Sequence, residues 1–554
     1  MIRTVLERFV EHSPMAIMAR LVMQCAIDDQ WLDAAEIDDD ADREPLREAL
    51  IACVADAVVA IGEALRPGAS TGAATGAVMG AGFAPAVTAL HDRMSRLRAG
   101  WGRALVKDGT ALLLPLATRR ANDWADAAGG LRVRVLDGGA LPSGLACTPG
   151  PDGCVVFDPD ETGGLPPGLL PVYDPEHGMV VDLVPYERGR VHERAFVGSL
   201  LESVQPGELW VIDGRFSTAA ILAGWPRGSG VFVLREHGCA PVWHPHGEAR
   251  EIGEFDGGRV FERPVAMIGD APGEAATVFR RVEWRPDEPG RDRVGVLTNA
   301  PASLIDAPRV MRLARARWRQ TLPLRVDPVF DGALTADVAA RALPLARGIV
   351  ATAYNVFSVM ASAVTGELAL DARDAERLPA HVAGGVRGAY IGMMIALPPA
   401  WWQRYDLLSI GTLGTLLRLL AHHVDPRSER RKRREHRLSA KSQTLLRAAT
   451  LDRLLHDDND DLTSNVFSLR TIAMATRDFS SNPSKALRHA SEALVMVTKY
   501  NRPIALLVSI EDWNRLLGEV RETSVSRLSL DGGGPVQRVP AVSAAAGLGE
   551  APLN

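Results

Sequence analysis

Cysteines and aromatic side chains are scarce in this chain of 554 residues, which has five cysteines and only 5% Phe, Trp and Tyr. An odd number of cysteines without a framework spacing argues against a disulfide-stabilised secreted protein and indicates reduced thiols. No run of 18 apolar residues is free of a charge or a break. Leu343 to Val364 comes closest, and Arg347 and Asn355 within it favour a buried helix. The N-terminal segment carries acidic residues, unlike a secretory signal. We therefore expect a cytoplasmic protein that does not span a membrane.

An excess of positive charge is also lacking, because 62 Lys and Arg residues face 68 Asp and Glu residues, for a net charge of −6. Any contact with DNA must therefore come from local basic patches. The densest one is RSERRKRREHR at residues 427–437, which either neutralises phosphates or forms a solvated linker. With 47% hydrophobic residues, most of the chain should fold, into roughly three or four domains.

Two short apolar runs each end in an Asp-Gly pair. Leu209 to Ile212 has the composition of a strand buried on both faces, and Asp213 follows it. Residues 131–136 alternate arginine with apolar side chains, as strands do, and Asp137 follows them. A carboxylate at the end of such a strand can lie in a cleft while the strand fixes its backbone, as a metal ligand requires. The alternative for each aspartate is a solvated turn.

Helical and strand patterns divide the chain into regions. Residues 1–125 have helical spacing of apolar side chains, with a helix predicted over 87–106, whereas 151–170 resemble a Pro/Gly/Asp loop. Residues 231–300 alternate short β-like runs with Gly, Pro and Asp turns, which is typical of hairpins. The fold class predicted is α/β, with a mixed sheet. The predicted regions are a helical N-terminal domain (1–125), a core (126–425) that contains the hairpins (231–300), a charged linker (426–465), a small α+β module (466–522) and a tail (523–554).

Together with their surroundings, the two strands resemble the core of bacterial insertion-sequence transposases of the DDE type. The resemblance rests on His192-Glu193-Arg194, Leu209 to Thr218 and Val231 to Gly238. It implies an RNase H-like mixed sheet with a β-strand insertion, formed by the core and the hairpins respectively. It also implies that Asp137 and Asp213 lie on neighbouring strands and bind Mg²⁺ together with a later glutamate. The side chains expected to contact DNA are Arg215, Arg235, Arg317 and Trp318.

The helix that should carry the third carboxylate departs from the family pattern. In the family this helix carries Tyr, two residues, Arg, three residues, Glu, six residues and Lys, usually with Trp just before the glutamate. When Trp318 is matched to that tryptophan and Arg317 to the arginine, Thr321 falls at the position of the glutamate. The frame cannot be shifted to supply one, because no glutamate occurs between Glu288 and Glu367.

The missing glutamate changes the chemistry expected of the site. Two-metal phosphoryl transfer uses two cations roughly 3.5–4 Å apart, one at the attacking and one at the leaving oxygen. A threonine hydroxyl is neutral and is a poor Mg²⁺ ligand beside carboxylates. Asp327 and Asp331 are the only nearby substitutes, and they follow Pro323, which ends or kinks a helix. We therefore expect Asp137 and Asp213 to hold one ion weakly or none, and catalysis to be impaired.

A group of histidines and one cysteine lies in the hairpin region: His237, Cys239, His244 and His246. These residue types can bind zinc, but their spacing matches no compact zinc site. The favoured interpretation is that these histidines are ordinary residues of β-hairpins and do not form a zinc site.

The C-terminal module closely resembles the prevent-host-death (Phd/YefM) antitoxins over residues 477–517. Asn482 can cap a helix that starts at Pro483, and two strands flank the turn at 500–503. The resemblance implies a homodimer that binds operator DNA, with a C-terminal segment that captures a cognate toxin. Residues 523–554 have few large apolar side chains, which predicts disorder and argues against toxin capture. The predicted phosphate contacts are Arg477, Lys485 and Arg488.

Three functions remain open at this point. The first is a transposase-derived protein that binds transposon-end-like or operator DNA with an impaired DDE site. The second is an active transposase with a substitute third carboxylate. The third is an antitoxin that regulates its own transcription.

Overall fold

The computed structural model describes residues 2–507 except 29–39, 67–81, 95–99, 120–122, 137–146, 150–154, 158–167, 187–192, 213–218, 227, 229, 237–242, 268–276, 289–292, 316–334, 336, 428–439, 456–470, 476–478, 480–482, 491–493 and 500–501. The chain divides into two compact units, residues 1–456 and 457–554. The fold is mixed α/β, as the sequence predicts.

The strands of the first unit form one ten-stranded sheet and a small separate hairpin. The strands of the sheet are β1 (Arg132–Leu136), β4 (Gly168–Asp174), β5 (Met179–Tyr186), β6 (Glu208–Ile212), β7 (Val231–Arg235), β8 (Trp243–Pro245), β9 (Arg250–Glu254), β10 (Gly258–Met267), β11 (Val278–Pro286) and β12 (Val294–Thr298). The separate hairpin pairs β2 (Cys147–Pro149) with β3 (Val155–Phe157).

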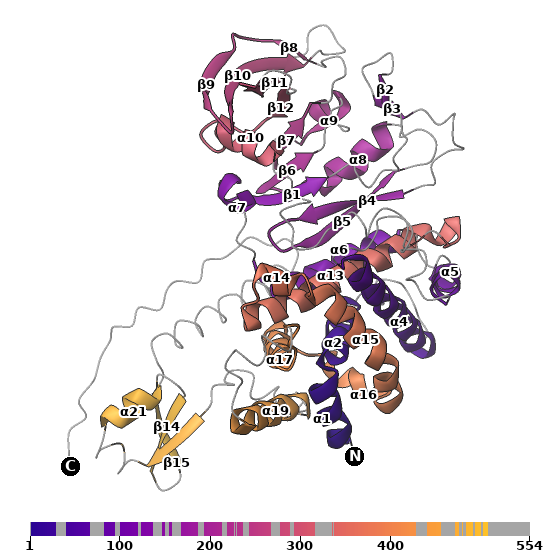
Figure 1. Ribbon diagram of the computed structural model, residues 1–554, viewed down its shortest axis with the longest axis vertical. Helices are drawn as coiled ribbons and strands as arrows, with labels where there is room; N and C mark the ends of the chain where they lie inside the picture. Colours follow the sequence, from indigo (N-terminus) through magenta and orange to yellow (C-terminus); the bar gives the residue numbers. More distant parts are fainter. Residues whose placement is uncertain are drawn as a thin grey trace, which may run out of the picture. The chain divides into compact units, whose positions relative to one another are not determined.

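The sheet changes character along its width (Figure 1). Its order is β5-β4-β1-β6-β7-β12-β11-β10-β8, with β9 paired to β10. β4 is antiparallel to both β5 and β1, whereas β6 and β7 continue parallel to β1. From β7 onward every pairing is antiparallel. The hairpin strands that the sequence predicts over 231–300 therefore extend the sheet beyond β7.

The helices of the first unit are α1 (Ile2–His12), α2 (Pro14–Ala26), α4 (Asp40–Ala64), α5 (Phe83–Met94), α6 (Trp101–Leu113), α7 (Asp123–Ala127), α8 (Glu193–Ser203), α9 (Ala219–Gly224), α10 (Ala307–Arg315), α13 (Leu343–Leu368), α14 (Ala372–Ala375), α15 (Leu378–Ala396), α16 (Pro399–Trp402), α17 (Ile410–Ala421) and α19 (Ala440–Leu455). Short 3-10 turns are η1 (Leu114–Leu116), η5 (Ala340–Ala342) and η6 (Gln403–Tyr405). The helices before residue 117 share one apolar core with α13, α15 and α17.

Alternation along the central strands gives each face of the sheet its own core. On β1, Val133 and Val135 face the helical layer, whereas Leu136 belongs to a second core shared with α8 and α9. β6 alternates in the same way, with Leu209 on the helical side and Ile212 on the other. β6 is buried on both faces, which requires its near-continuous apolar sequence. Figure 1 shows α6 and α13 lying along the helical face next to β5.

The predicted buried helix is α13, which lies at the centre of the helical layer. Among the described residues, the stretch Ala340–Leu368 is long and apolar enough to cross a membrane, but 83% of its apolar window is buried in the protein. The bent pair Arg373–Ala396 and Pro399–Tyr405 would pass the same test as one span. Asn355 of α13 is 1% exposed, accepts the Val180 N–H at 2.8 Å and donates to Thr110 Oγ1 at 2.8 Å. This side chain joins α13 to β5 and α6.

The single helix predicted over 87–106 is wrong, because two helices occupy this region. α5 ends at Met94 and α6 begins at Trp101. Gly100 precedes α6 with a φ of 87°, in the left-handed region where glycine carries no penalty. Apolar spacing continues through such a break, so periodicity alone did not locate it.

The loop predicted over 151–170 is also partly wrong, since β3 and the start of β4 lie within it. Pro171 lies inside β4, and a proline normally argues against an internal strand. Among the described residues, β1 pairs with β4 through Val172 and Tyr173, and Pro171 is the register partner of Leu183 on β5.

The second unit has a three-stranded sheet and a helix. Its elements are β13 (Thr471–Ala475), α21 (Pro483–Ala490), β14 (Leu494–Lys499) and β15 (Arg502–Leu507). β13 is parallel to β14, and β15 is antiparallel to β14. Its small core includes Met474, Ala486 and Val495. The predicted helix and strand pair are confirmed, while β13 was not predicted.

Gly348 on α13 and Gly102 on α6 allow their helices to approach closely. A Cβ on Gly348 would lie 2.4 Å from the Gly102 carbonyl oxygen, well inside contact distance. We expect Gly348→Ala to lower the free energy of unfolding by about 1–3 kcal/mol, because the two helices must separate. Gly366→Ala in the same helix is the control, since nothing lies within 4 Å of its Cβ position. Chemical denaturation of both variants measures the difference, and equal stability would contradict the close-packing argument.

Candidate functional site at the carboxyl ends of parallel strands

The carboxyl ends of three parallel strands form one row. Leu136, the last residue of β1, is the register partner of Ile212, the last residue of β6. Ile212 is in turn the partner of Leu234 on β7. All three side chains are at most 1% exposed and belong to the core on the α8 and α9 face. The carboxyl ends of adjacent parallel strands are where open α/β sheets place ligands.

Most of the predicted site residues lie outside the described residues. Those are Asp137, Asp213, Arg215, His237, Cys239, Arg317, Trp318, Thr321, Asp327, Asp331 and Arg477. The distance between the two aspartates and the place of any third carboxylate therefore stay predictions, and so does the zinc alternative.

Five predicted residues can be placed. Arg235 ends β7 opposite Val296 of β12 and is exposed at the carboxyl edge of the sheet. His244 on β8 and His246 just after it are also exposed. Lys485 is exposed on α21. Arg488 lies on the same helix, three residues further along the chain.

One carboxylate at this edge was not considered from the sequence. Glu236 directly follows Arg235, and its side chain accepts hydrogen bonds from Trp243 Nε1 at 2.6 Å and from Arg281 Nε at 3.0 Å. The Arg281 guanidinium also lies 4.8 Å from the centre of the Trp243 ring, a cation–π contact. Glu236 is therefore held by an arginine and a tryptophan of the β-hairpins. The Glu236 carboxylate is thus paired with Arg281 and is not available as a metal ligand in this arrangement.

A buried charged network lies across the opposite end of the same strands. Arg134 on β1 is 7% exposed and donates to Glu208 Oε1 at 3.0 Å and to Asp174 Oδ2 at 2.8 Å. Glu208 Oε2 accepts from Trp210 Nε1 at 3.0 Å. The Arg-apolar alternation of residues 131–136 predicts a strand, but not that Arg134 is enclosed by two carboxylates. Its partners come from distant parts of the chain, so the sequence carried no local signal for the network.

The electrostatics of this network favour its charged state. Burial alone raises the pKa of the Asp174 carboxyl, but the hydrogen bond from His177 and the charge of Arg134 outweigh burial and leave this pKa below its ordinary value. The same balance sets the pKa of the Asp182 carboxyl. Burial opposes its ionisation, yet a bidentate pair with Arg103 lowers the pKa of Asp182. Both aspartates are therefore ionised at neutral pH.

Asp174, Glu176 and His177 also bring one ligand atom each within 4.8 Å of one another. These residue types can bind a divalent cation. However, Asp174 Oδ2 already contacts the Arg134 guanidinium at 2.8 Å and the His177 ring at 3.0 Å. Asp174 Oδ1 accepts the backbone N–H groups of Glu176 and His177 at 2.9 and 3.1 Å. The carboxylate is fully used, and the adjacent positive charge opposes a metal ion.

The hairpin strands carry a second charged cluster beside Glu236. Glu283 on β11 pairs with Arg281 at 2.8 Å and with Arg285 at 3.0 Å. Burial raises the pKa of Glu283, but these two arginines outweigh it and lower this pKa to about 2. The arginines of β11 are thus largely neutralised by carboxylates of the same sheet. They offer less positive potential than their number in the sequence suggests.

No protein-family model matches the chain, and no curated protein matches it either. Its described geometry brings together two strand ends that precede aspartates, an exposed arginine and a paired glutamate.

Replacing Asp174 by Asn removes one of the two carboxylates that hold Arg134. We expect Asp174→Asn to lower the free energy of unfolding at pH 7 by about 1–3 kcal/mol, because a buried guanidinium loses a charged acceptor. A carboxyl whose pKa is lowered by folding stabilises fully above its unfolded pKa, near 4, and loses this contribution as pH falls toward its folded pKa. The wild type should therefore lose more stability than the variant between about pH 5 and 2.

Urea titrations across this pH range measure the two curves. Asp452→Asn, on the exposed side of α19, serves as the matched control. Parallel pH curves for wild type and Asp174→Asn would contradict the lowered pKa of Asp174.

Proposed function

We propose that this chain is a transposase-derived DNA-binding protein with an impaired DDE centre at Asp137 and Asp213 and an antitoxin-like DNA-binding module. The observation that carries the proposal is the parallel pairing of Leu136 with Ile212. Each of these residues directly precedes one of the two aspartates in the sequence. Two carboxylates that follow paired strand ends are well arranged to share a cation.

The order of the sheet supports an RNase H-like core. Such a core has its first strand in the middle, with antiparallel strands on one side and parallel strands on the other. The order β5-β4-β1-β6-β7 has these directions about β1. The hairpins β8 to β12 follow β7 in the chain, where the resembled transposases carry their β-strand insertion.

The metal chemistry explains why the centre should be impaired. Three carboxylates offset the charge of two Mg²⁺ ions, and here Thr321 stands where the third is expected. Glu236 is the carboxylate at the end of β7, but Arg281 and Trp243 hold it. Asp137 and Asp213 would therefore bind one Mg²⁺ ion weakly, and the protein would bind DNA more effectively than it cleaves DNA.

Cleavage of end-labelled duplex DNA and of supercoiled plasmid in Mg²⁺ tests the impaired centre. We expect the wild type to cleave neither substrate above background. Thr321→Glu should restore Mg²⁺-dependent nicking, because it returns the third carboxylate, and adding Asp213→Asn should abolish that nicking again. Asp256→Asn in the Thr321→Glu background is the control, since Asp256 has a φ of 47° that asparagine tolerates.

Efficient cleavage by the wild type that is lost in Asp213→Asn would instead identify a working transposase with a substitute carboxylate. In that case Asp327→Asn and Asp331→Asn would locate the substitute, while Glu236→Gln should leave cleavage unchanged.

Phosphate contacts by the C-terminal module predict how DNA affinity responds to salt. Lys485 and Arg488 lie on α21, in the module that resembles a dimeric antitoxin. We expect Lys485→Ala and Arg488→Ala each to reduce the slope of log affinity against log salt by about 1, since each contact releases counterions. Fluorescence anisotropy with labelled duplex DNA measures the slope, and Lys441→Ala on α19 is the control. Unchanged slopes in both variants would exclude α21 from the DNA contact.

A further inference from the structure

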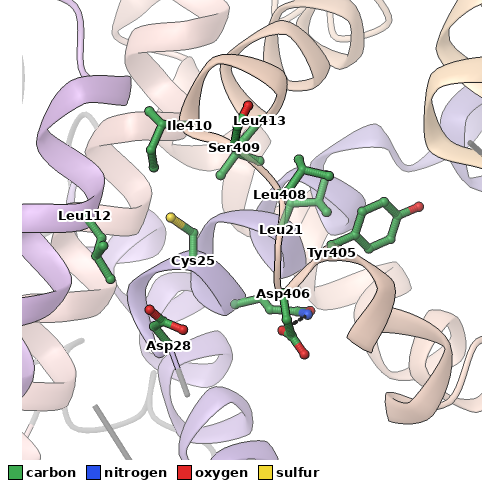
Figure 2. A pocket seen from close by; sticks show the side chains of 11 residues that line it. Leu21, Cys25, Asp28, Leu112, Tyr405, Asp406, Leu408, Ser409, Ile410 and Leu413 are labelled. Carbon is green, nitrogen blue, oxygen red and sulfur yellow. Dashed lines mark hydrogen bonds between the residues drawn. The ribbon is translucent and has the colours of Figure 1, made fainter. Parts of the chain in front are cut away.

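A cavity of about 240 Å³ lies among the helices of the first unit, away from the sheet edge described above. One side is formed by Leu21, Gln24 and Cys25 of α2 and by Asp28, two residues after the end of this helix. The other walls come from α6, from the turn before α17 and from α17 itself. Figure 2 shows Asp28, Cys25 and Asp406 around the cavity, with Leu112 and Ile410 also at its wall.

Hydrogen bonds hold the polar side of this cavity, formed by Gln24 and Asp406, in place. Gln24 donates to the Trp402 carbonyl at 2.7 Å and also to Asp406 Oδ1. The guanidinium of Arg47, which is 1% exposed, donates to the same Oδ1 at 2.7 Å. Arg20, equally buried, donates a hydrogen bond to Gln24 Oε1 at 3.2 Å. Asp406 is therefore fixed before any ligand arrives, which is what a binding site requires.

The charged groups that remain open to the cavity are carboxylates, which only accept hydrogen bonds. Both donors to Asp406 reach Oδ1, and no described residue donates to its Oδ2. No hydrogen bond or ion pair joins Asp28 to another described residue, whereas Ser409 Oγ is taken by the Thr412 N–H at 3.1 Å. The Cys25 thiol is neutral, because burial and then the charge of Asp28 raise the pKa of Cys25 to about 12. The cavity thus presents negative charge without a free cation among the described residues that form its wall.

The remaining wall is largely aliphatic and also includes Tyr405. Leu21, Leu112 and Leu413 line it together with Leu408 and Ile410. The cavity volume is smaller than the roughly 300–1,000 Å³ of sites for drug-sized ligands. The cavity therefore suits a smaller molecule. Acceptors at one side and an aliphatic wall at the other match a molecule with a positively charged donor and a short hydrocarbon part.

We propose that this cavity binds a small aliphatic amine, with its ammonium group at Asp28 and Asp406 and its hydrocarbon chain against Leu112 and Ile410. An ammonium group supplies three donors and a positive charge to carboxylates that have acceptor capacity left. An anion of the same size would meet two carboxylates. A neutral alcohol would gain the apolar contacts without the charge-assisted hydrogen bonds.

Cys25 provides a reporter inside the cavity of the full-length protein. The rate of its modification by methyl methanethiosulfonate, mapped by peptide mass spectrometry, is measured with increasing pentylamine, 1-pentanol or pentanoate at constant pH and ionic strength. We expect pentylamine to protect Cys25 saturably and to raise the melting temperature, with 1-pentanol weaker by on the order of tenfold and pentanoate inactive. Asp28→Asn should weaken the apparent affinity for pentylamine by about the same factor and leave the apparent affinity for 1-pentanol unchanged.

Two further variants keep the test decisive. Asp452→Asn on α19 controls for loss of a surface charge in the same unit. Leu112→Phe fills the cavity and should remove protection by pentylamine even if Asp28→Asn does not fold. Equal protection by pentylamine and 1-pentanol in the wild type, or protection by neither, would overturn the proposal. So would undiminished pentylamine protection in a folded Asp28→Asn.

Discussion

The parallel register of β1 against β6 is the constraint on which the rest of the sheet depends. It pairs segments that are 76 positions apart in the chain, residue 132 with residue 208 and residue 136 with residue 212. A slip by one residue would exchange the faces of β1 and move Arg134 into the apolar helical layer. Asp174 and Glu208 accept from Arg134 only in the observed register. The charged network therefore specifies the register, while the apolar side chains on both faces supply the stability.

Buried polar groups play a similar part in the helical layer. Asn355 is nearly enclosed, and its amide satisfies the backbone of β5 and the hydroxyl of Thr110. Leaving either partner without a bond would cost the desolvation of that group. One amide side chain thus fixes how α13 lies against both the sheet and α6. The close approach at Gly102 and Gly348 then allows the surrounding apolar side chains to pack.

Charge in this protein is organised mainly for pairing within the fold. On the hairpin strands, Arg280 pairs with Glu262 at 2.8 Å, and Arg281 and Arg285 pair with Glu283. These arginines stand close to carboxylates, so their positive field is short-ranged. The DNA contact that we propose would then rely on basic side chains outside such pairs. The cavity beside Asp406 shows the reverse arrangement, in which acceptors remain open after the internal pairs are made.

Local patterns in the sequence determined the elements that surround the candidate site. Apolar runs identified β6, β7 and α13, and the two strands followed by aspartates were correctly predicted because alternation and burial act over a few residues. That Thr321 falls where the resembled transposases carry a glutamate is likewise read from the sequence alone. Only the tertiary structure decided that β1 and β6 end side by side, that Arg134 is enclosed by Asp174 and Glu208, and that α2 and α17 leave a cavity between them. Those features depend on contacts between residues tens to hundreds of positions apart, and no periodicity within one segment encodes them.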